Sequence, residues 1–334
     1  MRVVSAEEID SVLAFPALIE ALAEAFRGGI VAPPRHHHAI RGASGDATLL
    51  LMPAWTESAG ADFVGVKIVS VMPGNAALGI PSVQGTYLLS DARGTPLAGL
   101  DGARLTLWRT AAASALAARH LARPEARRMV MVGAGALAPY LVRAHASVLR
   151  LSSIALWSRR PESARALAEQ LATEGLPVVA AEDLERAVRS ADLVSCATLS
   201  TKPLVRGAWL AQGAHLDLVG AFTPAMREAD DAALARASLY VDTEAALTEG
   251  GDVTVALASG AIGRNAIRGT LADLVTARAP GRTSPDEITA FKSIGASLED
   301  LAAAMLVWRE LAGNKAAQYP CSRAALESPT AATK

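Results

Sequence analysis

The sequence predicts an α/β protein made of two units, an α+β unit followed by a doubly wound parallel sheet. Two patterns lead to this prediction. Helical and extended segments are mixed up to about residue 100, whereas short apolar runs alternate with amphipathic stretches after Pro124. A chain of 334 residues, 51% of them hydrophobic, is also long enough for two separately buried cores.

The first unit begins with two short helices, predicted over 6–13 and 16–26. Ser5 is placed to cap the first of them, with Glu8 three residues later. Strand-like runs follow, each bounded by Gly, Pro or Asp, at 48–52, 63–71, 83–90 and 96–100. A long Ala-rich helix is then predicted over 102–121, ending before Pro124.

The second unit alternates strands with helices. Its apolar runs lie at 129–132, 154–157, 178–180, 193–196, 216–219 and 239–241. Such alternation predicts βαβ units with right-handed crossovers and a parallel sheet. A final helix is predicted over 295–311, with Ser297 as its cap. We expect residues 1–122 and 305–334 to form a substrate-binding and dimerisation domain, and 123–304 to form the second domain.

Composition argues against several classes of function. The 32 basic and 33 acidic residues leave a net charge of -1 without a block of one sign, so a nucleic-acid partner is not expected. Neither a signal peptide nor a membrane-spanning run is recognised, which favours a cytoplasmic setting. Cys196 and Cys321 are too few for a disulfide framework. Successive strand residues point to opposite faces, so the run His36-His37-His38 does not predict a metal site.

A glycine-rich turn follows the first apolar run of the second unit. The string Gly133-Ala134-Gly135-Ala136-Leu137-Ala138 matches G-x-G-x-x-G/A, with Ala in the third place. Gly133 would allow the tight turn, Gly135 the approach of a pyrophosphate, and Ala138 close packing of the helix on the sheet. An ordinary strand-to-helix turn is the alternative, but the βαβ context favours a Rossmann dinucleotide site.

The end of the next strand bears on the choice of cofactor. It reads Ser158-Arg159-Arg160 and lacks the acidic residue that usually bonds the ribose hydroxyls of NAD. Guanidinium groups can grip a ribose 2′-phosphate, whereas two solvated arginines at a helix start are the alternative. We therefore expect NADP(H) to be preferred, with NAD(H) as the second choice.

Three cations occupy unusual positions in the first unit. Lys67 lies inside an apolar strand, where its burial is costly without an anion. Arg109 has no carboxylate three or four residues away on its helix. Arg35 follows two prolines that stiffen the chain. If the three converge, they form a receptor for a substrate carboxylate; for each one alone, a pair with a distant Asp or Glu explains it equally well.

Several strings together resemble the ornithine cyclodeaminase/μ-crystallin family, from about residue 1 to 315. Besides the glycine-rich turn, they are Gly65-Val66-Lys67, Met72-Pro73-Gly74-Asn75, Gln84-Gly85-Thr86, Leu88-Leu89-Ser90-Asp91, Leu105-Thr106-Leu107-Trp108-Arg109-Thr110-Ala111-Ala112 and Phe291-Lys292-Ser293-Ile294-Gly295. The resemblance implies a homodimer that pairs through the N-terminal unit. It also implies a small cyclic imino acid or amino acid as the substrate.

The resemblance assigns roles to individual residues. Lys67 and Arg109 are expected to be catalytic. The expected substrate-binding residues are Arg35, Lys67, Asn75, Arg109, Phe222 and Ile294. The expected cofactor-binding residues are Ser82, Thr110, Gly133, Gly135, Ala136, Leu137, Ser158, Arg159, Arg160, Ala197, Thr198, Gly220 and Ser293.

One departure from the family pattern concerns the acid/base of cyclodeaminases. Those enzymes carry an Asp shortly after a strand end, and Phe222 stands at this position here. A phenyl ring cannot transfer a proton, a step that typically contributes about 10²–10⁴-fold to the rate. The μ-crystallin-like ketimine reductases share the absence of this Asp.

The sequence therefore predicts NADPH-dependent reduction of Δ1-pyrroline-2-carboxylate or Δ1-piperideine-2-carboxylate to L-proline or L-pipecolate. The three cations would hold the carboxylate, and Lys67 or a bound water would protonate the imine nitrogen. The alternatives are an ornithine cyclodeaminase, an alanine or N-substituted amino-acid dehydrogenase, and a non-catalytic ligand-binding protein. The catalytic hypothesis requires that the three cations converge and are not neutralised by the protein's own acids.

Overall fold

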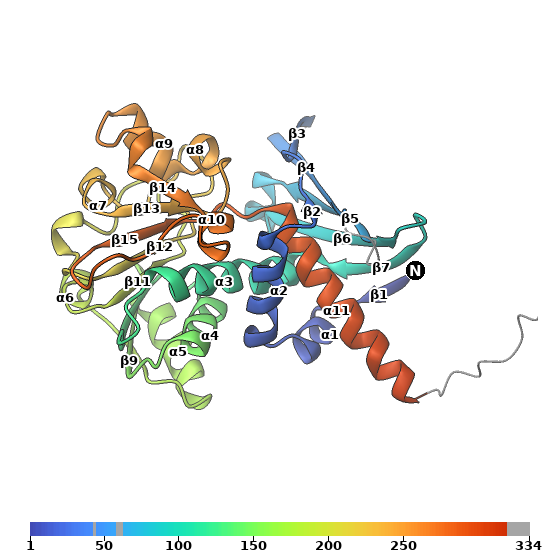
Figure 1. Ribbon diagram of the computed structural model, residues 1–334, viewed down its shortest axis with the longest axis horizontal. Helices are drawn as coiled ribbons and strands as arrows, with labels where there is room; N and C mark the ends of the chain where they lie inside the picture. Colours follow the sequence, from blue (N-terminus) through green and yellow to red (C-terminus); the bar gives the residue numbers. More distant parts are fainter. Residues whose placement is uncertain (43–44, 58–62, 319–334) are drawn as a thin grey trace, which may run out of the picture.

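The computed structural model describes residues 1–42, 45–57 and 63–318. Two sheets lie at opposite ends of the molecule, and helix α3 (Gly102–Leu121) runs between them (Figure 1). This arrangement confirms the predicted fold class, a Rossmann unit joined to an α+β unit. No helix in the described ranges is long and apolar enough to cross a membrane.

The first sheet is mostly antiparallel, with strand order β1-β7-β6-β5-β4-β2 and β3 paired to β4. Its strands are β1 (Arg2–Val4), β2 (Ile30–Val31), β3 (His36–Gly42), β4 (Gly45–Thr56), β5 (Phe63–Val71), β6 (Val83–Asp91) and β7 (Pro96–Asp101). Helices α3 and α11 (Ser297–Gln318) pack against β5 and β6, and α2 (Phe15–Arg27) packs on both helices. Helix α1 (Ala6–Val12) and the 3-10 helix η1 (Pro73–Leu78) complete this unit.

The second sheet is parallel throughout, with strand order β10-β9-β8-β11-β12-β15-β13-β14. Its strands are β8 (Arg128–Val132), β9 (Ser153–Trp157), β10 (Val178–Ala180), β11 (Leu193–Cys196), β12 (His215–Leu218), β13 (Ser238–Val241), β14 (Ile267–Thr270) and β15 (Thr289–Lys292). The first five follow the 3-2-1-4-5 order of a Rossmann sheet. Ligands of such sheets bind at the carboxyl ends of the strands, where the order reverses between β8 and β11.

Short helices connect these strands and cover both faces of the second sheet. They are α4 (Ala138–Val148), α5 (Pro161–Thr173), α6 (Leu184–Arg189), η2 (Gly207–Trp209), α7 (Asp231–Ala235), α8 (Ala246–Glu249), α9 (Gly251–Ala258), η3 (Arg264–Ala266) and α10 (Leu271–Val275). Ala138 is fully buried at the start of α4, as close packing of helix and sheet requires.

The predicted bounds of the helix over 102–121 are confirmed, whereas the last helix, predicted over 295–311, spans Ser297–Gln318. Ser5 and Glu8 form the predicted capping box at α1. Ser297 was predicted to cap the last helix, and this is wrong because α11 begins at Ser297 itself. The carbonyl of Ala296 already accepts the N–H of Glu299, at 3.1 Å, so the cap position is Ala296, one residue before the predicted cap.

The predicted division into domains stays a prediction. Helix α11 crosses the expected junction at 304–305 without a break and packs against β4, β5 and β6. Cys321 lies outside the described residues.

Candidate active site

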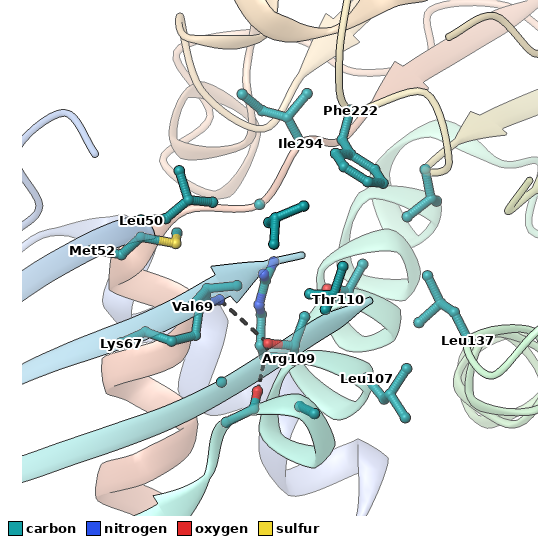
Figure 2. A pocket seen from close by; sticks show the side chains of 18 of the residues that line it. Leu50, Met52, Lys67, Val69, Leu107, Arg109, Thr110, Leu137, Phe222 and Ile294 are labelled. Carbon is teal, nitrogen blue, oxygen red and sulfur yellow. Dashed lines mark hydrogen bonds between the residues drawn. The ribbon is translucent and has the colours of Figure 1, made fainter. Parts of the chain in front are cut away.

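A cavity of about 510 Å³ lies between the two units. Side chains from β4, β5, β6 and α3 form one side, and the glycine-rich turn with the loops after β12 and β15 forms the other (Figure 2). Its volume falls within the range of about 300–1,000 Å³ that is usual for small-molecule sites. The cavity is therefore large enough for a small substrate together with part of a cofactor.

The three predicted cations converge on this cavity. Lys67 projects from the middle of β5, Arg109 from α3, and Arg35 from the segment before β3. Lys67 and Arg109 are only 2% and 5% exposed. Alternation along β5 turns Lys67 towards the helices and the cavity, as expected for its place in an extended strand.

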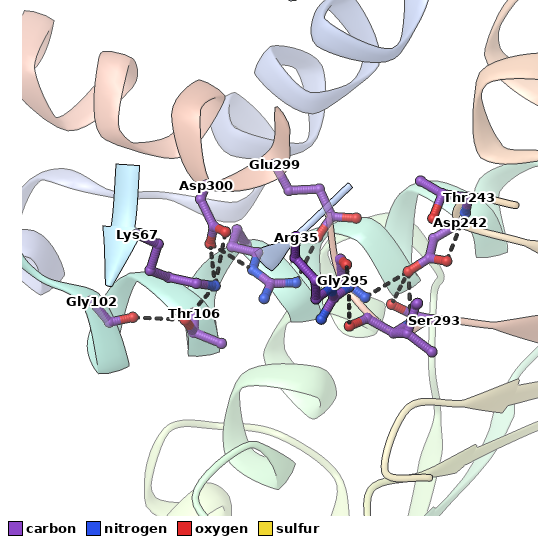
Figure 3. A network of polar contacts seen from close by, with 12 residues as sticks. Arg35, Lys67, Gly102, Thr106, Asp242, Thr243, Ser293, Gly295, Glu299 and Asp300 are labelled. Carbon is purple, nitrogen blue, oxygen red and sulfur yellow. Dashed lines mark hydrogen bonds and ion pairs between the residues drawn. The ribbon is translucent and has the colours of Figure 1, made fainter. Parts of the chain in front are cut away.

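Acidic residues of α11 hold two of these cations from behind. The Nζ of Lys67 lies 2.8 and 2.9 Å from the two carboxylate oxygens of Asp300 (Figure 3). The Nε of Arg109 donates to the same carboxylate at 3.0 Å, and its Nη1 donates to Oε2 of Glu299 at 2.7 Å. Arg109 thus has no partner on its own helix, as predicted, but has two from a distant one.

Arg35 is also paired. Its Nε lies 3.4 Å from Oε2 of Glu249, and its Nη2 donates to the carbonyls of Ile294 and Gly295. The requirement that the protein's own acids leave the cations unpaired is therefore not met, because each of the three meets a carboxylate from a distant part of the chain. The catalytic hypothesis then depends on whether these acids leave the cavity side of the cluster charged.

The acids nevertheless leave the cavity face of the cluster cationic. Glu299 and Asp300 are fully buried and do not line the cavity. Burial raises the pKa of Glu299 to about 7, and Asp242 and Asp300 add to this while Arg109 opposes it. Glu299 therefore loses part of its charge near neutrality. The Nη2 of Arg109 makes no hydrogen bond to a described residue, which leaves a donor for a ligand.

Lys67 combines a charge with a readily lost proton. Burial lowers the pKa of its ammonium to about 8, with Arg109 adding to the shift and Asp300 opposing it. The hydroxyl of Thr106 lies 3.3 Å from Nζ as a further partner. Below pH 8 the group is mostly protonated, and its acidity is then close to that of an efficient general acid at neutral pH.

A short segment after β15, residues 293–295, forms the wall between the cations and the second unit; we call it the strap. Oδ2 of Asp242 accepts the N–H groups of Ile294 and Gly295, both at 2.6 Å, and the hydroxyl of Ser293 at 3.1 Å. Gly295 has φ +80°, and a Cβ there would lie 2.2 Å from Nη1 of Arg109. The strap can pass this close to the guanidinium only because the residue is glycine.

The glycine-rich turn has the geometry of a dinucleotide site. Gly133 has φ +117°, and a Cβ there would lie 2.5 Å from the carbonyl oxygen of Ala197. A Cβ on Gly135 would meet nothing within 4 Å, so the backbone is open on the side where a pyrophosphate approaches. These residues fit a dinucleotide. Thr110, Ala136, Leu137 and Ser293, predicted to lie near the cofactor, all line the adjoining cavity.

Glu228 was not predicted from the sequence, yet it ties together two cofactor-side loops. Its Oε1 accepts the N–H and hydroxyl of Thr198 at 2.6 and 2.9 Å, and its Oε2 accepts the N–H of Gly220 at 2.7 Å. Burial raises the pKa of Glu228 to about 7, with Lys292 opposing the shift. The sequence held no signal that set Glu228 apart, because it stands in the charged run Arg227-Glu228-Ala229-Asp230-Asp231.

Other predicted residues do not line the cavity. Asn75 lies in η1, where its amide donates to the carbonyl of Pro81 at 3.1 Å, and neither Asn75 nor Ser82 lines the cavity. Arg159 and Arg160 are exposed, and their side chains form no ion pair with described residues.

Two of the predicted substrate-binding residues line the cavity. Phe222 and Ile294 line it, and Phe222 is 42% exposed. Among the residues that the structure describes, no cluster of His, Cys, Asp or Glu could hold a metal ion.

Comparison with known sequences identifies relatives along nearly the whole chain. The model of the ornithine cyclodeaminase/mu-crystallin family matches residues 2–315. A Delta(1)-pyrroline-2-carboxylate reductase of Paracoccus denitrificans is 42% identical over 293 residues, 87% of this chain and 92% of the relative. Protein SAR DEFICIENT 4 of Arabidopsis thaliana is 39% identical over 284 residues, 83% of this chain and 86% of the relative.

Comparison with solved structures also identifies relatives along nearly the whole chain. The Thermococcus litoralis Delta(1)-pyrroline-2-carboxylate reductase in complex with NADH and L-proline superposes with a TM-score of 0.88 and 30% identity, over 94% of this chain and 98% of that one. An archaeal alanine dehydrogenase dimer with bound NAD has a TM-score of 0.86 and 28% identity, with 94% and 97% covered. These relatives confirm the expectation of a nicotinamide-dependent oxidoreductase that acts on C=N bonds. The chain belongs to the ornithine cyclodeaminase/μ-crystallin family.

Proposed function

We propose that this protein reduces cyclic ketimine carboxylates, Δ1-pyrroline-2-carboxylate or Δ1-piperideine-2-carboxylate, to L-proline or L-pipecolate. The observation that carries the proposal is the convergence of Arg35, Lys67 and Arg109 at one end of a cavity that adjoins a dinucleotide turn. The names of the relatives from Paracoccus and Thermococcus support the same substrate class.

Each cation would have a distinct part in the reaction. Arg35 and the free Nη2 of Arg109 would bind the substrate carboxylate and so fix the ring in one orientation. A bound reduced nicotinamide supplies the hydride for the imine carbon. Lys67, held by Asp300, would protonate the imine nitrogen, because its lowered pKa makes the proton easy to release.

The cavity gives little support to a cyclodeaminase. Phe222 lies where that activity needs an acid/base, and no Asp or Glu among the described residues lines the cavity. Alanine dehydrogenase activity is the second candidate, favoured by the likeness to the archaeal dimer. Parallel assays with a cyclic ketimine and with pyruvate plus ammonia would separate the two.

We further propose a preference for NADP(H) over NAD(H). Ser158, Arg159 and Arg160 follow β9, where the ribose of the cofactor is bound in Rossmann domains. The two guanidinium groups are exposed and have no carboxylate partner among the described residues, so they are free for a phosphate. We also propose a cytoplasmic setting.

A homodimer through the first unit is also proposed. Because Lys67 faces the helices, its neighbours Val66 and Ile68 on β5 point to the opposite face of the sheet. Val64, on that same face, is 47% exposed. A second copy of the chain would bury this apolar surface, and the archaeal relative is a dimer.

Replacing Lys67 with Met tests the proton donor. We expect kcat for ketimine reduction to fall by about 10²–10⁴-fold, because the imine nitrogen loses its acid. The affinity for NADPH, measured by fluorescence titration, should stay nearly the same. Lys202→Met, a change at an exposed lysine, is the matched control and should keep wild-type turnover. Wild-type kcat in Lys67→Met would remove Lys67 from the mechanism.

The pH profile tests the state of the same lysine. A donor with a pKa of about 8 is protonated below that pH and loses its proton above it. We therefore expect kcat/KM for reduction to be flat below pH 8 and to fall about tenfold per unit above it. In Lys67→Arg the activity should be low and this fall should be absent. A fall that persists in Lys67→Arg would assign the titration to the substrate.

The cofactor preference is tested with Arg159→Ala and Arg160→Ala. A hydrogen bond to a charged group contributes about 1.5–3 kcal/mol, so each change should weaken NADPH binding about tenfold or more. NADH binding should be unaffected, as should both cofactors in Arg150→Ala, another exposed arginine. Equal affinity of the unchanged protein for NADPH and NADH, measured by calorimetry, would contradict the preference.

Sedimentation velocity tests the dimer. The unchanged protein should sediment as a dimer, and Ile68→Asp should sediment as a monomer because a charge would be buried in the interface. Val179→Asp, at a 60% exposed apolar position on β10, should stay dimeric. A monomeric unchanged protein would overturn this proposal.

A further inference from the structure

We propose that the cavity selects imino carboxylates whose ring carries a bulky apolar substituent, and that it discriminates against substrates with a second charged group. This inference rests on the proposed function and goes beyond it by naming the part of the substrate that lies away from the carboxylate. The observation that supports the inference is that the residues lining the cavity change from cationic to apolar along its length.

The length of the apolar part of the cavity can be estimated along strand β5. Lys67, Val69 and Val71 follow one another along the cavity face of the strand, and all three line the cavity. Residues two apart on a strand are about 7 Å apart, so Val71 lies about 13 Å from Lys67. An unsubstituted five- or six-membered ring is much shorter than this span.

Neighbouring strands continue the same wall. Leu50 of β4 pairs with Val69, and Val83 of β6 pairs with Val71. Gly85 pairs with Val69 on the other side and lines the cavity without a side chain of its own. The sheet thus presents an apolar floor that extends well past the space of a small ring.

The second unit supplies a facing apolar wall. Phe222 and Leu199 both line the cavity and are 42% and 68% exposed, and Val83 on the opposite side is 51% exposed. Exposed apolar side chains that line one cavity are a surface that an apolar ligand group would bury. Figure 2 shows Phe222 and Ile294 in the upper part of the view and Thr110 below them.

The charges of the lining residues disfavour substrates that carry a second charged group. No Asp or Glu among the described lining residues could bind the second ammonium of a diamino acid. Arg35, Lys67 and Arg109 all lie at the carboxylate end, so a second carboxylate farther along would lie beside Val71 and Val83 without a cationic partner.

A substrate series tests the inference. We would measure kcat/KM with Δ1-pyrroline-2-carboxylate, with its ring-methylated, ring-ethylated and ring-phenylated derivatives, and with a carboxymethyl derivative. Full burial of each added methylene is expected to raise kcat/KM by about fourfold, and the phenyl derivative should exceed the unsubstituted ring. The carboxymethyl derivative should be the poorest substrate.

Val83→Asp is the matching variant, because an exposed position tolerates a charge without loss of folding. It should lower the ratio of kcat/KM for the phenyl derivative over the unsubstituted ring at least tenfold. Val179→Asp adds the same charge at an exposed apolar residue on the far edge of the other sheet, and should leave the ratio unchanged. A ratio that does not move in Val83→Asp would overturn the assignment of the wall.

A binding measurement keeps the inference separate from the proposed function. Calorimetry would compare L-proline and its ring-phenylated derivative on the NADP+ complex, and the derivative should bind more tightly whether or not any imine is reduced. Reduction of the unsubstituted ring together with weaker binding and turnover of the phenyl compounds would overturn the inference alone. Failure to reduce any ketimine would overturn the proposed function. The calorimetric comparison would still show whether the apolar wall binds the ring substituent.

Discussion

Asp300 holds two cations that belong to different elements. Its carboxylate is fully buried, bonds Nζ of Lys67 on β5 and accepts Nε of Arg109 on α3. Removing one partner of a buried ion pair typically costs about 3–5 kcal/mol, so these contacts fix α11 against both the sheet and the helix. Two of the three side chains that would meet the substrate, Lys67 and Arg109, are therefore placed by the same interaction that closes the first unit.

The same pairing determines the charge that a ligand meets. Asp300 and Glu299 compensate much of the charge of Lys67 and Arg109, yet both acids lie behind the cations and away from the cavity. With the pKa of Glu299 raised to about 7, the cluster becomes more positive as the pH falls. A substrate carboxylate thus completes a cluster that the protein has only partly neutralised. The apolar remainder of the cavity gives it no second charged contact.

The sequence was sufficient for patterns that are local. The strand over 63–71, the helix over 102–121, the glycine-rich turn and the three unusual cations all appear in the structure. It was insufficient where partners are distant, since Asp300 is 191 residues from Arg109 and 233 from Lys67. Strand β15 was missed because a run of four residues ending in Lys292 has little apolar signal, and its charge is explained only by Asp252, 3.2 Å away in the fold.

The most direct test of this account is a crystal structure with NADPH and pyrrole-2-carboxylate, a planar analogue that cannot be reduced. The account predicts the carboxylate within hydrogen-bonding distance of Arg35 and Arg109, and the ring nitrogen facing Lys67, with Asp300 still bonded to both Lys67 and Arg109. A carboxylate bound elsewhere in the cavity, with the three cations still held only by their own acids, would contradict it.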